Sequence, residues 1–81
     1  MKKTRDRKIR HILMKHLLSK NMTTNELFST VSHEINDRRF GLNVAIVSSN
    51  LVYLRNINKV EDTVLKYGRL WKIVEGVEVD V

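Results

Sequence analysis

Residues 43–58, NVAIVSSNLVYLRNIN, restrict the fold of this chain more than any other stretch. On a helix of about 3.6 residues per turn, one side collects the larger apolar residues Val44, Val47, Leu51 and Leu54, and is widened by Ile46, Tyr53 and Ile57. Asn43 is a favourable N-cap, and Leu42 precedes it as a residue that can pack on the first turns. We therefore expect a helix that is buried on one face and presents small, mostly polar groups on the other.

Length and composition indicate one small basic domain. The chain has 81 residues, so a single domain over residues 1–81 is expected, and its formal net charge of +6 favours an anionic partner such as nucleic acid. It has no cysteine, which excludes disulfides and cysteine zinc sites and is compatible with a reducing compartment. No apolar run is long enough to span a bilayer or to form a signal-peptide core. We therefore expect a cytoplasmic protein with no membrane partner.

The first residues are strongly basic and lead into an amphipathic segment. We expect a basic N-terminal arm over residues 1–8 and a helix over about residues 5–19, with the apolar positions Ile9, Ile12, Leu13 and Leu17. His16 lies on the same face, where a structural role is far more common than a ligand role. Met14 and Leu18 extend the apolar surface sideways, as ordinary packing or as part of a dimer contact.

A capping box marks the start of the next helix. Thr23 and Glu26 have the spacing at which each side chain bonds the other residue's backbone amide. The helix is expected to bury Leu27, Val31 and Ile35 and to end between residues 36 and 39, before Gly41. Near that end, Arg38 and Arg39 are explained equally well by the helix dipole and by contacts with DNA phosphates.

The last third of the chain reads as a hairpin. Residues 59–66 and 69–74 are β-prone runs separated by Tyr67–Gly68, where glycine can adopt the positive φ of a tight turn. A short strand at Met22–Thr23 can join this sheet. Trp71 and Ile73 share one strand face and are expected to cover the core, with Lys72 on the other face. Residues 76–81 are expected to form an edge strand or a frayed tail.

The spacing V-S-x-x-L-x-x-L over residues 47–54 resembles the recognition helix of winged helix-turn-helix regulators. The order of elements is also similar to that family, which predicts an α+β fold with three helices followed by a β-hairpin wing. The resemblance implies that the exposed side of the third helix enters the DNA major groove. Its contact residues would be Ala45, Ser48, Ser49, Val52, Arg55 and Asn56.

The resemblance also implies contacts outside that helix. The wing would bind DNA through Lys66, Tyr67, Arg69 and Lys72, and the DNA backbone would be contacted by Lys2, Lys3, Arg5, Arg38 and Arg39. Few long polar groups on the third helix can read base edges, so sequence discrimination is expected to be modest and affinity strongly dependent on salt.

The sequence gives little support to an enzymatic or metal-binding function. His11 and His16 are five residues apart, whereas a spacing of four would place two metal ligands on one helix face. Ser32–His33–Glu34 has the residue types of a catalytic triad, but adjacent residues on a helix point in different directions. None of the three glycines belongs to a phosphate-binding loop. We expect no catalytic activity, no metal site and no cofactor.

Two functions remain compatible with the residues. The first is a small transcriptional regulator, cytoplasmic and nucleoid-associated, that binds double-stranded DNA as a monomer or weak homodimer. The second is a winged-helix protein-interaction module that modulates RNA polymerase or another regulator, which the scarcity of basic groups on the third helix would suit.

Overall fold

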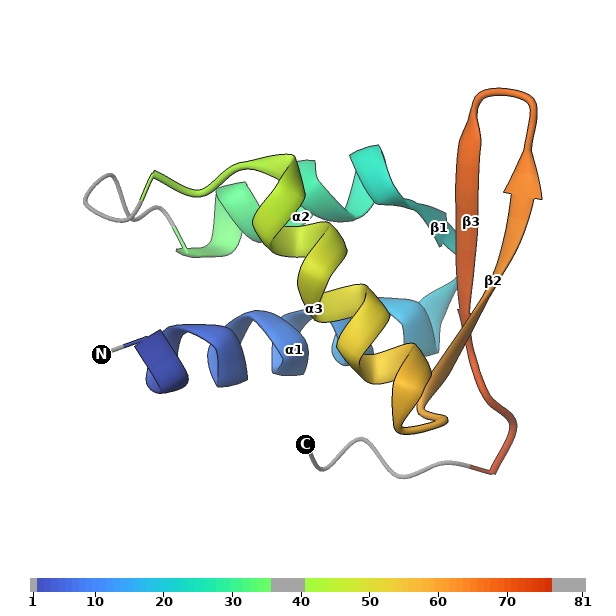
Figure 1. Cartoon of the computed structure of the whole chain (residues 1–81), viewed down its shortest axis with the longest axis horizontal. Helices are drawn as coiled ribbons and strands as arrows, with labels where there is room; N and C mark the ends of the chain where they lie inside the picture. Colours follow the sequence, from blue (N-terminus) through green and yellow to red (C-terminus); the bar gives the residue numbers. More distant parts are fainter. Residues whose placement is uncertain (1, 36–40, 77–81) are drawn as a thin grey trace.

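The computed structural model describes residues 2–35 and 41–76, with side chains from Arg5 onward. Within these residues, three helices are followed by a β-hairpin (Figure 1). The fold is therefore α+β, and its layout is compatible with a winged helix. None of the described helices has both the length and the apolar character to cross a membrane. The elements are α1 (Lys2–Ser19), β1 (Met22–Thr23), α2 (Thr24–Ile35), α3 (Val44–Asn56), β2 (Val60–Leu65) and β3 (Gly68–Ile73).

The described strands form an antiparallel sheet in the order β1-β3-β2. The expected short strand at Met22–Thr23 is present and pairs with β3, where Met22 lies opposite Trp71. The hairpin turn is Lys66–Tyr67, one residue earlier than expected, because Leu65 and Gly68 still pair across the strands. Gly68 is therefore the first residue of β3 and not part of the turn. Its φ of +142° is a conformation that a residue with a side chain rarely adopts.

The first helix begins earlier than expected. Residues 2–8, predicted as a basic arm, are the first turns of α1. The expected apolar positions of α1 are buried, and Met14 joins them with no exposed surface. Leu18, in contrast, is 56% exposed. Thus one of the two residues at the side of the apolar stripe belongs to the core and the other lies on the surface.

The predicted capping box is confirmed. The Thr23 backbone amide donates to Glu26 Oε1 at 2.9 Å, and the Glu26 amide donates to Thr23 Oγ1 at 3.2 Å. Because the Thr23 amide and hydroxyl both bond the ionised carboxylate, the pKa of Glu26 lies below its ordinary value. The helix buries Leu27 and Val31 as expected, with Ile35 packed at the edge of the core. The predicted end of this helix, between residues 36 and 39, lies outside the described residues.

The central helix has the expected cap but a narrower buried face. Asn43 Oδ1 accepts from the Ile46 amide at 3.0 Å, as an N-cap should. The predicted core positions Val47, Leu51 and Leu54 are fully buried, whereas the exposed fractions of the remaining apolar residues are 42% for Val44, 47% for Tyr53 and 42% for Ile57. The prediction that these three side chains are buried was wrong, because α1, α2 and β2, the elements that pack against α3, leave them partly exposed.

Two further residues of α3 differ from the simple helical pattern. Val52, placed on the outward side by the sequence, is half-buried and packs against the core. Asn50 is buried, with 5% of its surface exposed, although it is polar. The buried face of α3 therefore includes one amide side chain, which bonds the Ile46 carbonyl of its own helix and two side chains of α1.

Candidate nucleic-acid interface

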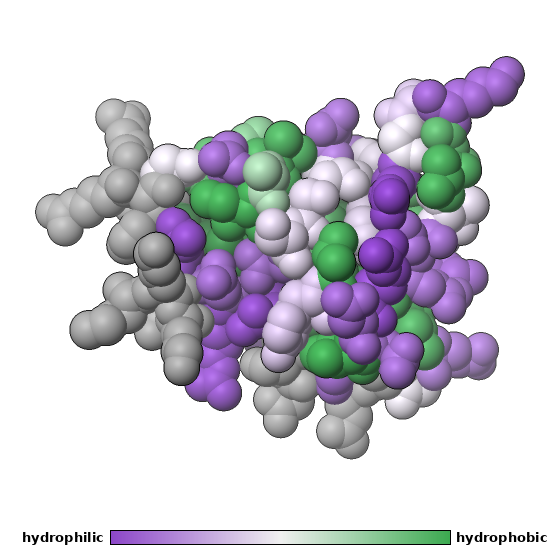
Figure 2. Space-filling model, in the orientation of Figure 1, coloured by the Kyte–Doolittle hydropathy of each residue, from purple (hydrophilic) through white to green (hydrophobic). Residues whose placement is uncertain are grey.

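The outward side of α3 is the surface that the sequence predicted as a recognition face. Ala45, Ser49 and Asn56 are exposed there, and Ser48 is half-buried. Figure 2 shows pale, weakly polar groups over α3 with apolar groups among them, and strongly hydrophilic groups on both sides. Since the exposed side chains are short, another molecule can approach the helix backbone closely.

A shallow hollow of about 340 Å³ separates this face from the N-terminal half of α1. Ser49 and Tyr53 of α3 line it together with Arg5 and Arg10 of α1. The first turn of α1 contains no acidic residue, although negative charge is favourable at that end of a helix dipole. The basic start of α1 is thus adjacent to the recognition face, and its charge does not serve the stability of its own helix.

A polar cluster joins α1 to α3 at the floor of this hollow. Asn50 Nδ2 donates to the Ile46 carbonyl at 2.9 Å and to Asp6 Oδ1 at 3.4 Å, while Arg10 Nη1 donates to Asn50 Oδ1 at 3.3 Å. The Arg10 guanidinium also lies 4.2 Å from the centre of the Tyr53 ring, in cation–π geometry. These contacts hold Arg10 in one position beside α3.

The hairpin borders α3 on its other side. The strand register and the alternation of side chains place Asp62, Arg69 and Trp71 on one hairpin face. Trp71 is buried on this face, and its Nε1 donates to Thr24 Oγ1 at 2.8 Å. Asp62 lies opposite Trp71 in the register, and its Oδ2 accepts from Arg55 Nη1 of α3 at 3.2 Å and from Arg69 Nη1 at 2.8 Å. Arg55 and Arg69, each predicted to bind DNA, therefore share one carboxylate.

The remaining predicted wing residues lie elsewhere on the hairpin. Lys66 and Tyr67 form the exposed turn, with Tyr67 78% exposed. Lys72 lies on the opposite hairpin face from Arg69, as the alternation predicted, and its Nζ is 3.0 Å from Glu61 Oε1. The tip is consequently available for contact, whereas Lys72 is directed away from α3.

Four of the predicted DNA-backbone contacts lie outside the described side chains. Lys2 and Lys3 belong to the first turn of α1, but their side chains are not described. Arg38 and Arg39 lie outside the described residues. Arg5 is described: 19% of its side chain is exposed, and its Nε is 4.0 Å from Asp6 Oδ1.

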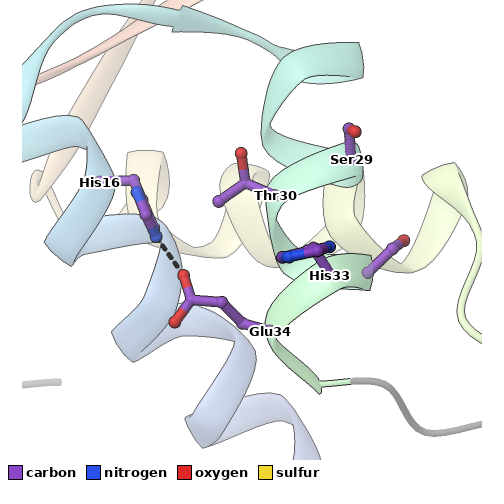
Figure 3. Close-up of a pocket in the computed structure, with 6 residues that line it drawn as sticks. His16, Ser29, Thr30, His33 and Glu34 are labelled. Atoms are coloured by element: carbon purple, nitrogen blue, oxygen red, sulfur yellow. Dashed lines mark hydrogen bonds and ion pairs between the residues drawn. The ribbon is translucent and has the colours of Figure 1, made fainter.

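A second hollow, of about 630 Å³, lies between α1 and α2. Figure 3 shows His16 of α1 directed toward Glu34 of α2, with Thr30 and His33 nearby. Glu34 accepts hydrogen bonds from Lys15 and His16, and these contacts lower its pKa below the ordinary value. Among the described residues, no three histidine or acidic side chains are placed to hold a metal ion. The polar groups here connect two helices, which agrees with the structural role predicted for His16.

Sequence reasoning missed the residues that control the charge of the interface, namely Asp6, Asn50 and Asp62. Of these, only Asp62 could have been found from the sequence. It is two residues from Val60 on β2, so it lies on the core side of the strand. An acidic residue there needs a cationic partner.

Comparisons of this chain with protein families, with curated proteins and with solved structures give no match.

Proposed function

We propose that this protein binds double-stranded DNA with modest sequence preference and acts as a small transcriptional regulator, cytoplasmic and associated with the nucleoid. One observation carries the proposal: the small, polar face of α3 lies between two groups of side chains in which arginines outnumber acids two to one. Arg5 and Arg10 line the hollow on the α1 side together with Asp6, and Arg55 and Arg69 lie around Asp62 on the hairpin side. A duplex has the matching pattern, with a groove between two rows of phosphates.

In this binding mode α3 occupies the major groove. Ser49 can hydrogen-bond a base edge or a phosphate, and the Ala45 methyl can contact a thymine methyl group. The α1 arginines face the phosphates on one side, and Lys66 at the hairpin turn reaches those on the other. Since phosphate contacts carry no sequence information, most of the affinity depends on salt and little on sequence.

A winged-helix protein-interaction module is the second candidate, and the exposed apolar groups of α3 favour it. Val44, Tyr53 and Ile57 are each more than two-fifths exposed on the helix that would enter DNA. An apolar surface with a polar surround is typical of protein contacts. In this case the partner would be RNA polymerase or another regulator, and DNA affinity would be low at every salt concentration.

The substitution Ser49→Glu separates the two functions. It places a carboxylate on an exposed position of α3, where like-charge repulsion by phosphate should weaken DNA binding at least about tenfold. The assay is fluorescence anisotropy of a labelled random-sequence duplex, titrated at low and at near-physiological salt. Ser29→Glu is the matched control, because Ser29 is an exposed serine on α2 that lines the other hollow, between α1 and α2.

If the proposal holds, the wild type binds the duplex with a steep salt dependence, Ser29→Glu binds comparably, and Ser49→Glu binds much more weakly. Equal affinity of the two variants would remove α3 from the DNA interface. Absence of wild-type binding at either salt concentration would shift the assignment to the protein-interaction module.

A further inference from the structure

We infer that Arg55 and Arg69 form a phosphate-binding pair that the carboxylate of Asp62 occupies in the free protein. This inference rests on the proposed DNA-binding function and identifies a regulatory contact within the same interface. Asp62 acts as an internal competitor: it takes the position of a DNA phosphate and limits the affinity of the protein for any duplex.

The geometry is that of an anion held by two guanidinium groups. Arg69 Nη1 donates to Asp62 Oδ2 at 2.8 Å, and Arg55 Nη1 donates to both carboxylate oxygens, at 3.2 and 3.4 Å. The three residues come from β3, α3 and β2, so the pair exists only because the hairpin folds against the end of α3. A phosphate offers the same charge-assisted hydrogen bonds to arginine as a carboxylate does.

Burial shows which member of the cluster is fixed. The Asp62 side chain is only 13% exposed, while those of Arg55 and Arg69 are 37% and 47% exposed. The carboxylate is therefore held inside, and the guanidinium groups lie above it with part of their surface in solvent. A phosphate can reach them from outside, but it must compete with an acceptor that is already in place.

The competition determines how much charge DNA meets on this side of α3. Two arginines and one aspartate have a net charge of about +1, whereas the two arginines alone would have a charge of +2. The carboxylate also repels an approaching phosphate. Each phosphate contact that a protein makes adds about 0.9 to the slope of log affinity against log salt. Asp62 should therefore make the slope of the wild type shallower and its affinity lower.

The test is Asp62→Asn, with Glu61→Gln as a control that changes the net charge equally. Glu61 is the neighbouring residue, on the opposite hairpin face, and pairs with Lys72. In the anisotropy assay, Asp62→Asn should bind the random-sequence duplex about five- to thirtyfold more tightly than Glu61→Gln at low salt, with a salt slope steeper by about one to two units.

The substitution Arg69→Gln provides a second measurement. In the wild type it should lower the affinity by a smaller factor than in Asp62→Asn, because Asp62 already binds this arginine, whereas in Asp62→Asn it should remove most of the gain. Circular dichroism of each variant establishes that it is folded. If Asp62→Asn were too unstable to assay, a large loss of affinity in the Arg69→Gln single variant would overturn the inference and a small loss would support it.

The outcomes separate this inference from the proposed function. If the wild type binds DNA and Asp62→Asn matches Glu61→Gln, then Asp62 is not a competitor and only the inference fails. If neither the wild type nor Asp62→Asn binds DNA, both fail. Binding by Asp62→Asn that greatly exceeds wild-type binding, together with its loss on adding Arg69→Gln, supports both.

Discussion

Replacing Asn50 with alanine should destabilise the domain more than replacing Asn56, the other asparagine of α3. Asn50 is 5% exposed, and its side chain connects α3 to two charged residues of α1. The amide donates to the Ile46 carbonyl and to Asp6 and accepts from Arg10. The alanine variant loses these contacts while the rest of the fold is retained.

The magnitude follows from the three distances. The 2.9 Å bond to the Ile46 carbonyl has good length and is worth about 1 kcal/mol. The bonds of 3.3 and 3.4 Å to Arg10 and Asp6 are long, and their charged partners keep contact with solvent, so together they add about another 1 kcal/mol. Alanine has a higher helix propensity than asparagine, which offsets about 0.5 kcal/mol. The free energy of unfolding should therefore fall by about 1–2 kcal/mol, and Tm by about 5–15 °C.

Urea unfolding followed by tryptophan fluorescence measures this change. Trp71 is the only tryptophan in the sequence and is 1% exposed, so its emission reports directly on the core. Asn56→Ala is the matched control, because Asn56 is an exposed asparagine on the same helix, and a change within about 0.5 kcal/mol is expected for it. Equal stabilities of the two variants would refute the reasoning, since the buried amide would then add nothing to the contact between α1 and α3.

Two further predictions concern stability. Leu51→Ala removes a fully buried side chain and should lower the free energy of unfolding by about 2–5 kcal/mol in the same urea assay. A loss below about 1 kcal/mol would show that Leu51 is not a core residue. Bonds from Lys15 and His16 lower the pKa of Glu34, so their stabilising effect is fully present above the ordinary glutamate pKa and is lost as pH falls through the lowered value. Thermal melts between about pH 7 and pH 3 should therefore show a smaller loss of stability for Glu34→Gln than for the wild type, and identical pH profiles would contradict this role of Glu34.

The secondary structure was largely predictable because its signals are local. The capping box at Thr23 and Glu26 and the N-cap at Asn43 depend on residues three positions apart, and both are present as expected. Alternation along the strands placed Trp71 and Lys72 on opposite hairpin faces. Errors occurred where neighbours distant in sequence decide the outcome, as for Tyr53, whose exposed ring lies beside Arg10 of α1.

The candidate interface was only partly predictable, for a physical reason. The sequence determined which residues are cationic and, for Ala45 and Ser49, which lie on the outward side of α3, since these follow from residue type and helical period. The availability of each cation depends on the acid that packing brings near it: Asp62 holds Arg55 and Arg69, and Glu61 pairs with Lys72.

Distance in space, and not position in the chain, sets such electrostatic interactions. Asn50 meets Asp6 across 44 residues and Arg10 across 40, and no periodic pattern joins those positions. Residue types and hydrophobic period alone therefore specified a small basic α+β domain. Only the tertiary structure decided which charges that domain presents to a partner and which it neutralises internally, because Coulomb energy depends on the separation and burial of charges once the chain has folded.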